Sequence, residues 1–410
     1  MYIIRVDKMF KEIFSKNERN MLFLFSIFLI AILAFSMIEV VNAGDKTISP
    51  TTSGGLKKAI DSSQSGTKII LNNGVYAGGN NQGIKISKNI TIQGNGKNVV
   101  IDGKNKYSEL FQVISTNSNP VSLTIKNVKI KNFNKLGYVS TIQNSENANI
   151  RISGSSFTND GLSINNELRG VVTVSKTSFK NSRSMPITNF GTMKISGSTF
   201  INNKGATGAG AIENQQYASM TISNCRFIDN RGINAGAVKN NGDMIISRSI
   251  FTINTATARQ ASGGAIYNQK FDSPTTLKVT DCKFKNNVAA KTYNAIFNDP
   301  NGILTTNKNI ITQKDGVLVN IIDKGSFNIR GKKVIYYTNM IKNQAFIDFY
   351  WDDSYDSYFI SKNSNKIKVQ FNNKNLKTYT NSSNLKSFYL KTAKKYVFDF
   401  EKTRLKKKLK

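Results

Sequence analysis

The chain has 410 residues, with 57 Lys and Arg against 25 Asp and Glu, and a formal net charge of +32 at pH 7. Histidine is absent, which excludes the commonest general base and the commonest metal ligand. The positive charge is spread along the chain, whereas a nucleic-acid-binding domain usually gathers it on one helix or stripe, so we expect a cationic surface and no nucleic-acid partner.

Residues 1–43 are predicted to be an export signal. Five Lys and Arg residues precede an apolar run from Met21 to Ile38, and a small residue, Ala43, stands before Gly44. These parts are typical of a secretory signal peptide cut between Ala43 and Gly44. The run is also just long enough to span a bilayer, so an uncleaved signal anchor formed by residues 21–41 is the alternative. Either way, we expect the remainder to be extracellular or at the cell surface, with membrane contact only through an uncleaved N-terminal segment.

Residues 44–66 are predicted to form an N-terminal cap. In the stretch GGLKKAIDSSQSG, Leu56 and Ile60 lie four residues apart, which is typical of a short amphipathic helix. The end of a stack of strands exposes unpaired backbone groups. We therefore expect this helix to lie over the first turn of the strands that follow.

Residues 67–310 contain two interleaved repeats. In the first, represented by KISGSTF, a short apolar strand is followed by an aromatic residue at a constant offset. The phenylalanines in this position are Phe157, Phe179, Phe200, Phe227, Phe251 and Phe284. In the second, represented by GGAIYN, an apolar residue is followed two positions later by asparagine. These asparagines are Asn144, Asn166, Asn189, Asn214, Asn240, Asn268 and Asn298.

The repeat length predicts an all-β solenoid. Steps of 22 to 30 residues separate the asparagines, and strands of three or four residues alternate with Gly, Asn and Ser turns. This suits a parallel β-helix of roughly ten turns, in which like residues of successive turns lie about 4.8 Å apart. The phenylalanines then form an inward stack, and the asparagine amides form a hydrogen-bonded ladder at a corner. The spacing varies in stretches such as INNKGATGAG, where we expect projecting loops.

The C-terminal part follows another pattern. Longer alternating segments such as KVIYYTN and AFIDFYW predict a small β domain or divergent cap over residues 311–402. The acidic stretch WDDSYD, from Trp351 to Asp356, is interpreted as a hairpin loop, with a Ca²⁺ or sugar site as the alternative. Residues 403–410, TRLKKKLK, are predicted to be a solvated basic tail.

The repeats resemble those of a known class of proteins. GGAIYN, combined with SGSTFINN and TDCKFKNN, is similar to the right-handed parallel β-helix repeats of adhesin-like surface proteins of methanogenic archaea, which are themselves similar to polymorphic outer-membrane-protein repeats. The resemblance covers about residues 52 to 310. It implies a right-handed coil and an exported protein that acts in attachment or cell-envelope interaction.

The two cysteines are expected to be unpaired. Cys225 and Cys282 each lie two residues before a phenylalanine of the repeat, and Ser249 occupies the same place in the turn between them. They are therefore two turns, or roughly 9.6 Å, apart, beyond the usual limit of about 7 Å between the Cα atoms of a disulfide. We expect both to fill small inward positions.

No catalytic, cofactor or metal site is predicted. A polysaccharide lyase needs carboxylates clustered around Ca²⁺, and a hydrolase needs a carboxylate pair. The acids of the repeats fall in different registers, and Glu213 is expected to stack on Lys239 as an ordinary surface pair.

We therefore predict a non-catalytic protein whose loops and cationic polar face bind glycans, anionic envelope polymers or another cell surface. The alternatives are a β-helix polysaccharide lyase or glycoside hydrolase, and a structural component of the envelope.

Overall fold

The computed structural model describes residues 44–408, apart from 135–138, 259–262, 270–274, 290–294, 300–301, 312–320, 330–331, 342–343, 352–353, 364–365, 372–373, 381–384 and 390–393. The predicted signal or anchor, including Ala43, lies outside the described residues. None of the helices within the described part combines the length and the apolar content needed to cross a membrane.

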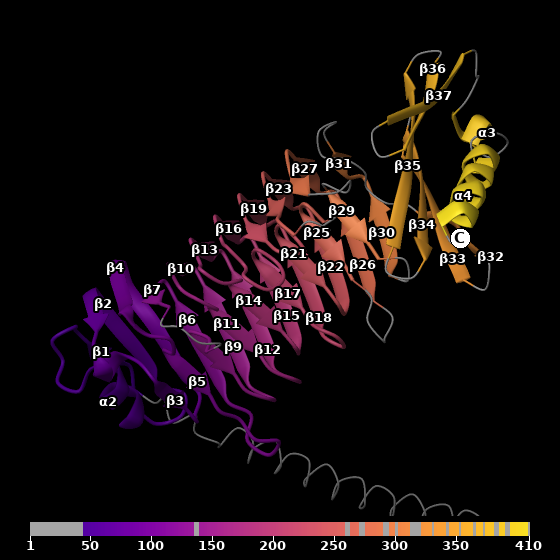
Figure 1. The fold of residues 1–410 in the computed structure, drawn as a ribbon. Coiled ribbons are helices and arrows are strands. Elements are labelled where there is room, and N and C mark those ends of the chain that lie inside the picture. Colours follow the sequence, from indigo (N-terminus) through magenta and orange to yellow (C-terminus); the bar gives the residue numbers. More distant parts are fainter. Residues whose placement is uncertain are drawn as a thin grey trace, which may run out of the picture.

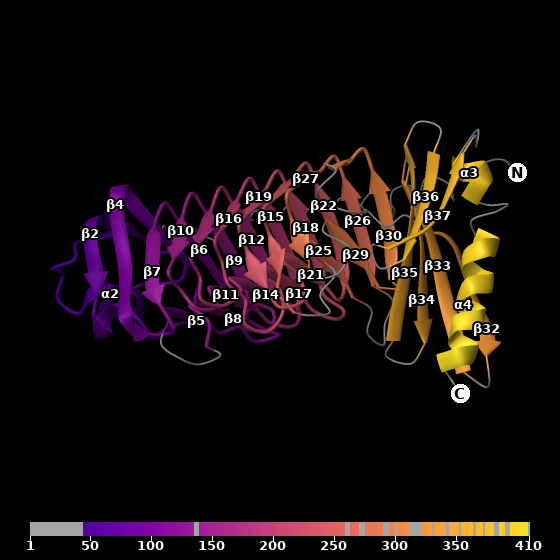
Figure 2. The same ribbon diagram turned by 45° about the horizontal axis from the view of Figure 1, so that its top comes forward.

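Most of the chain is a parallel β-helix, seen from two sides in Figures 1 and 2. Its largest sheet has 19 described strands and consists of two parallel ladders. The first ladder contains β1 (Lys46–Ile48), β2 (Lys68–Ala77), β4 (Ile90–Tyr107), β6 (Ser122–Lys126), β9 (Asn149–Ser153), β12 (Val171–Ser175), β15 (Thr192–Ser196), β18 (Ser219–Ser223), β22 (Asp243–Ser247), β26 (Thr276–Thr280) and β30 (Ile303–Asn307).

The second ladder lies beside the first, and the long strands β2 and β4 extend into both. Its other strands are β7 (Lys129–Phe133), β10 (Ser156–Thr158), β13 (Ser178–Lys180), β16 (Thr199–Ile201), β19 (Arg226–Ile228), β23 (Ile250–Thr252), β27 (Lys283–Lys285) and β31 (Ile310–Ile311). We call the two ladders together the wide sheet.

A narrow sheet closes the coil. Its nine described strands are β3 (Ile84–Ile86), β5 (Phe111–Val113), β8 (Ile142–Asn144), β11 (Ile164–Asn166), β14 (Ile187–Asn189), β17 (Ile212–Asn214), β21 (Val238–Asn240), β25 (Ile266–Asn268) and β29 (Ile296–Asn298). They give about nine turns, where the repeats predicted roughly ten. A small third sheet joins β20 (Arg231–Gly232), β24 (Thr255–Ala256) and β28 (Val288–Ala289).

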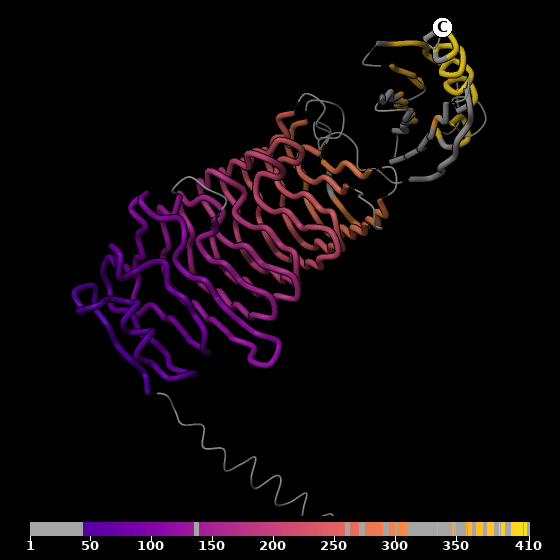
Figure 3. The backbone as a smooth tube through the Cα atoms, turned by 60° about the horizontal axis from the view of Figure 1, so that its bottom comes forward, coloured from indigo at the N-terminus to yellow at the C-terminus, as the bar shows by residue number. Residues whose placement is uncertain are grey.

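The turns follow one another along a single axis, as the tube in Figure 3 shows. Pairing joins identical repeat positions, so that Phe200 aligns with Phe227, and Asn214 aligns with Asn240. Side chains alternate between the inside and outside of each strand, and the inward ones form one continuous core from Ile48 to Ile296. The predicted parallel β-helix is confirmed.

The N-terminal segment differs from the predicted helical cap. Helix α2 (Gly55–Asp61) is present, and its Leu56 and Ile60 belong to the core. However, β1 precedes this helix and already pairs with β2. The segment thus contributes a strand to the stack, and that strand stands at the edge that the helix was expected to cover. A helical N-terminal cap over residues 44–66 is not supported. A single 3₁₀ turn, η1 (Gly79–Asn81), follows β2.

The C-terminal part is a six-stranded antiparallel sheet with two helices. The strands are β32 (Ile321–Ile329), β33 (Lys332–Ile341), β34 (Gln344–Trp351), β35 (Ser354–Asn363), β36 (Lys366–Phe371) and β37 (Lys374–Thr380), and the helices are α3 (Leu385–Phe388) and α4 (Lys394–Lys408). The small C-terminal β region is thus confirmed, whereas the helices were not anticipated. Most of the expected basic tail belongs to α4, and two acids of WDDSYD, residues 352–353, lie outside the described residues.

Candidate functional site

The predicted phenylalanines form a continuous stack inside the second ladder. Adjacent ring centroids lie 4.7 to 5.0 Å apart, and the ring planes are within 6° of parallel. All six side chains are buried. The strand spacing itself sets this distance, so the stack supports the scaffold and offers no surface to a ligand.

The seven predicted asparagines form a continuous ladder at one corner. Each Nδ2 group donates to the Oδ1 atom in the next turn, over 2.6 to 2.9 Å. The ladder starts at Asn144, because the preceding turn has Val113 in that position, and the Asn144 Oδ1 atom has no partner. All seven residues are buried, so this ladder too is structural.

A second asparagine ladder lies after the phenylalanines. It joins Asn203, Asn230, Asn254 and Asn287 through Nδ2 to Oδ1 hydrogen bonds of 2.8 to 2.9 Å. The sequence reasoning missed it, although its signal is visible in the repeated F-x-N-N of FINN and FKNN. The first asparagine of that motif takes the left-handed backbone of the corner, and the second turns inward. Asp160 and Ser182 occupy the inward position in two earlier turns.

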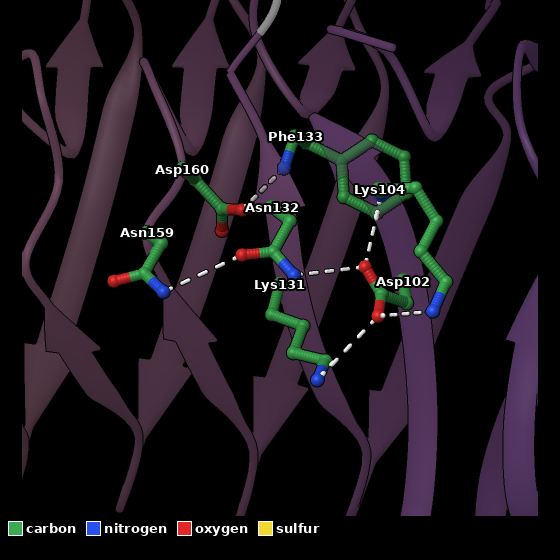
Figure 4. Close-up of polar contacts among 7 residues, drawn as sticks. All are labelled: Asp102, Lys104, Lys131, Asn132, Phe133, Asn159 and Asp160. Carbon is green, nitrogen blue, oxygen red and sulfur yellow. Dashed lines mark hydrogen bonds and ion pairs between the residues drawn. The ribbon is translucent and has the colours of Figure 1, made fainter. Parts of the chain in front are cut away.

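Asp160 stands in an earlier turn at the position that the asparagines of the second ladder occupy (Figure 4). It is fully buried, its Oδ1 atom accepts a hydrogen bond from the Phe133 backbone N–H at 2.9 Å, and its Oδ2 atom has no partner. Burial, together with the nearby charge of Asp102, raises the pKa of Asp160 well above its usual value, and the Phe133 N–H opposes this only in part. Burial therefore favours the protonated form of this carboxyl.

Both cysteines are buried and free, as predicted. Burial raises the pKa of each thiol to about 11, which keeps it in the unreactive protonated form. Each sulfur lies near a carbonyl oxygen of its own turn, at 3.2 Å for Cys225 and 3.3 Å for Cys282. Both side chains fill inward positions in the core.

Glu213 and Lys239 form the expected pair, but not on the surface. The Lys239 Nζ atom lies 2.9 Å from the Glu213 Oε1 atom on the outer side of the narrow sheet, and each side chain is only 9% exposed. The loop before β17 covers them, because a Cβ on Gly208 would lie 2.3 Å from the Glu213 carboxylate. The prediction of an ordinary surface pair is wrong. The alternation of side chains along β17 places Glu213 on the outer side of the sheet, but the inserted loop before β17 covers it.

The charges are unevenly distributed between the two main sheets. The described strands of the wide sheet carry fifteen Lys and Arg residues, none of them buried, and two acids, Asp102 and Asp243. The cations are Lys46, Lys68, Lys97, Lys104, Lys106, Lys126, Lys129, Lys131, Arg151, Lys180, Lys194, Arg226, Lys278, Lys283 and Lys285. The described strands of the narrow sheet carry two cations and one acid. We call the outer surface of the wide sheet the cationic face.

Hydroxyl side chains accompany these cations. Ser153, Ser175, Ser196, Ser223 and Ser247 align in five consecutive turns. No aromatic side chain is exposed on the described strands of the wide sheet, since their Phe and Tyr residues face the core. Cations and hydroxyls on a regular surface are groups that can contact an anionic, oxygen-rich polymer. The described strands of the wide sheet offer no exposed aromatic ring on which nucleic-acid bases could stack.

Acid and thiol side chains do not cluster in the described part of the chain. No three or more Cys, Asp or Glu residues there lie close enough to hold a metal ion together.

Comparisons with known proteins identify no family for this chain. No protein-family model and no curated protein sequence matches the chain. Among solved structures, Escherichia coli YbhC is similar at 12% identity and a TM-score of 0.32, over 67% of this chain and 87% of that one. The Dettilon tailspike protein is similar at 9% identity and a TM-score of 0.18, over 79% and 81% of the two chains. Such distant similarities say nothing about what this chain binds.

Proposed function

We propose that this chain is an exported, adhesin-like β-helix protein that binds anionic glycans or envelope polymers through its cationic face and is not an enzyme. The observation that supports this most directly is the charge distribution, with fifteen cations and two acids on the described strands of the wide sheet. Export is supported by the charged and apolar pattern of residues 1–43 and extracellular localisation by the resemblance of the repeats.

A rigid scaffold makes such a face effective. Neighbouring strands lie about 4.8 Å apart, and Arg151, Lys194 and Lys278 share one register position at intervals of two and three strands. An extended polymer can therefore meet several cations without reorganising the protein. A single exposed ion pair contributes only about 0.2 to 1 kcal/mol, and useful affinity therefore requires several simultaneous contacts. The binding should weaken with added salt, because exposed charges are screened.

Binding of the purified full chain to polygalacturonate and to neutral dextran tests this function. We expect binding to polygalacturonate that weakens as the salt concentration rises, and no measurable binding to dextran. Equal binding to both polymers, or no binding to polygalacturonate at low salt, would contradict the proposal. Release of unsaturated or shortened sugars during the same incubation would contradict its non-catalytic part.

A further inference from the structure

Six lysines are concentrated on three neighbouring strands near the N-terminal end of the wide sheet. They are Lys97, Lys104, Lys106, Lys126, Lys129 and Lys131, on β4, β6 and β7. Strand β4 pairs with both β6 and β7, so these side chains belong to one continuous area. The only acid on these strands is Asp102, whose side chain is 3% exposed. No other described part of the cationic face has as many cations on as few strands.

A groove runs through this area. It has a volume of about 610 Å³, and its charged lining residues are Lys97 and Lys129. The chain is tightly packed at this corner: a Cβ on Gly94 would lie 2.1 Å from the Asn127 carbonyl oxygen, and a Cβ on Gly154 would lie 2.3 Å from the Asn127 Oδ1 atom. Both positions therefore require glycine, and Ser155 and Ser156 also line the groove.

Asp102 holds two further lysines beside the groove (Figure 4). Its Oδ2 atom lies 3.4 Å from the Nζ atoms of both Lys104 and Lys131, and its Oδ1 atom accepts hydrogen bonds of 2.9 Å from Asn132 Nδ2 and the Lys104 backbone N–H. Burial acts to raise the pKa of Asp102, but these hydrogen bonds and the two ammonium charges outweigh it, and the pKa is lowered. The carboxylate thus stays charged.

The two ammonium groups remain accessible. The Lys104 and Lys131 side chains are 55% and 40% exposed. An ammonium group has three N–H donors, so contact with one oxygen of Asp102 leaves donors for a ligand. Both groups converge on a single oxygen atom and are therefore close enough to share one incoming anionic group. Lys129 and Lys131, two positions apart on β7, face the same side and connect this pair to the groove.

We propose that this lysine cluster is the main docking site for an acidic glycan. One carboxylate or sulfate of the glycan bridges Lys104 and Lys131, and the following residues of the glycan lie in the groove against Lys97 and Lys129. Asp102 is a positioning residue that fixes the bridging pair. This inference rests on the proposed function and narrows it to one part of the cationic face and one class of polymer. A glycan is favoured over a nucleic acid because the described strands around the groove expose no aromatic side chain for base stacking.

A matched pair of double variants tests the location. Lys129→Gln with Lys131→Gln removes two charges from the cluster, and Lys194→Gln with Lys278→Gln removes two charges from β15 and β26 of the same face. Binding of the full chains to polygalacturonate, dextran sulfate, single-stranded DNA and dextran is measured at one salt concentration. We expect the cluster variant to bind polygalacturonate or dextran sulfate about tenfold more weakly, or about threefold per lysine, and the control variant to lose less than threefold.

The outcomes separate the two proposals. Equal losses in both variants would overturn the docking site while leaving the cationic face as the binding surface. No binding of any acidic glycan by the unaltered chain would overturn both. Tighter binding of DNA than of either acidic glycan would overturn the assignment to glycans. Preference for polygalacturonate or for dextran sulfate then identifies the anionic group as carboxylate or sulfate.

The role of Asp102 is tested by whether its substitution weakens or strengthens anion binding. In a diffuse cationic patch, removal of any acid should strengthen anion binding, and Asp243→Asn on β22 provides that control. We expect Asp102→Asn to weaken binding about threefold, because the bridging lysines lose their shared anchor, while Asp243→Asn leaves it equal or slightly stronger. Stronger binding by both variants would overturn the positioning role. Thermal unfolding of each variant, together with the double lysine variants, shows whether a loss reflects misfolding.

Discussion

At the scale of single residues, the backbone of the coil is strained where a residue is poorly suited to a left-handed corner. The corner after each phenylalanine requires a left-handed backbone, and asparagine, which tolerates that conformation, occupies it in most turns. Ile253 occupies the corner in one turn, with φ of 60° and a side chain that is 48% exposed. A β-branched residue in this conformation is costly, so the local stability of the turn is limited by one residue.

Ile253→Asn should therefore stabilise the protein. Left-handed backbone costs a non-glycine residue about 1–2 kcal/mol, and asparagine recovers part of this, so we expect a gain of about 1 kcal/mol in a urea or thermal unfolding experiment. Ile245→Asn is the matched control, since Ile245 is 46% exposed but lies in the extended strand β22. If both variants gained equally, loss of exposed apolar surface, and not backbone strain, would explain the result.

Asp160 makes a different contribution, which depends on pH. Its folded-state pKa is raised, so the folded protein holds a proton that the unfolded chain releases above about pH 4. Stability from this residue is present below the unfolded pKa and decreases as the pH rises toward the folded pKa. An asparagine there has no such cost, and its amide can donate to the equivalent carbonyl of the preceding turn, as Asn203 does to Phe179.

Asp160→Asn should thus raise the thermal midpoint at pH 7 by about 2–4 °C, which corresponds to roughly 1 kcal/mol. The difference should shrink below pH 4, where the unfolded aspartate is also protonated. Unfolding scans of both proteins from pH 3 to pH 8 provide the comparison. A difference that did not change with pH would show that the pKa of Asp160 is not raised by folding.

At the scale of elements, the corner ladders bind successive turns together. Asn214 accepts a hydrogen bond from Asn189 at 2.8 Å and donates to Asn240 at 2.9 Å, in a fully buried site. Its loss affects three turns at once, because the amides on both sides lose a partner. The effect on stability should extend beyond the turn in which the substitution is made.

Asn214→Ala is expected to cost about 2–3 kcal/mol, through lost hydrogen bonds and a buried cavity. Gln215→Ala, in the next and more exposed position, should cost less than about 1 kcal/mol. Urea unfolding measures the difference, and amide hydrogen exchange should show faster opening of β14, β17 and β21 in the first variant alone. Unchanged exchange in β14 and β21 would mean that the ladder does not couple the turns.

The sequence predicts elements well where every turn repeats the same requirement. The Asn214 ladder and the Phe200 stack could be predicted because one residue type recurs at one position. The second ladder was missed because Asp160 and Ser182 interrupt it, although F-x-N-N marks its later turns. The burial of Glu213 could not be predicted, since it depends on an insertion before β17 that the repeat does not contain.

At the scale of the molecule, the proposed function depends on where the coil places its charges. The sequence shows a basic chain, but the allocation of fifteen cations to one described sheet and two to the other appears only when the strands are stacked. Helix α4, which contains most of the predicted basic tail, likewise could not be foreseen. Its apolar residues Tyr396, Val397, Phe398 and Phe400 are nearly consecutive and do not follow the spacing of an amphipathic helix, and mostly charged residues follow them. The candidate site is therefore a property of the fold, built from residues that are unremarkable one by one.

The most direct test of this account is chemical acetylation of lysines in the full chain, with and without polygalacturonate, followed by peptide mass spectrometry. We expect the polymer to protect lysines of the cationic face, with the greatest protection at Lys97, Lys129 and Lys131. Lys85, which is exposed on the narrow sheet, should react equally in both samples. Protection of Lys85 to the same extent, or protection confined to helix α4, would contradict the assignment of binding to the wide sheet.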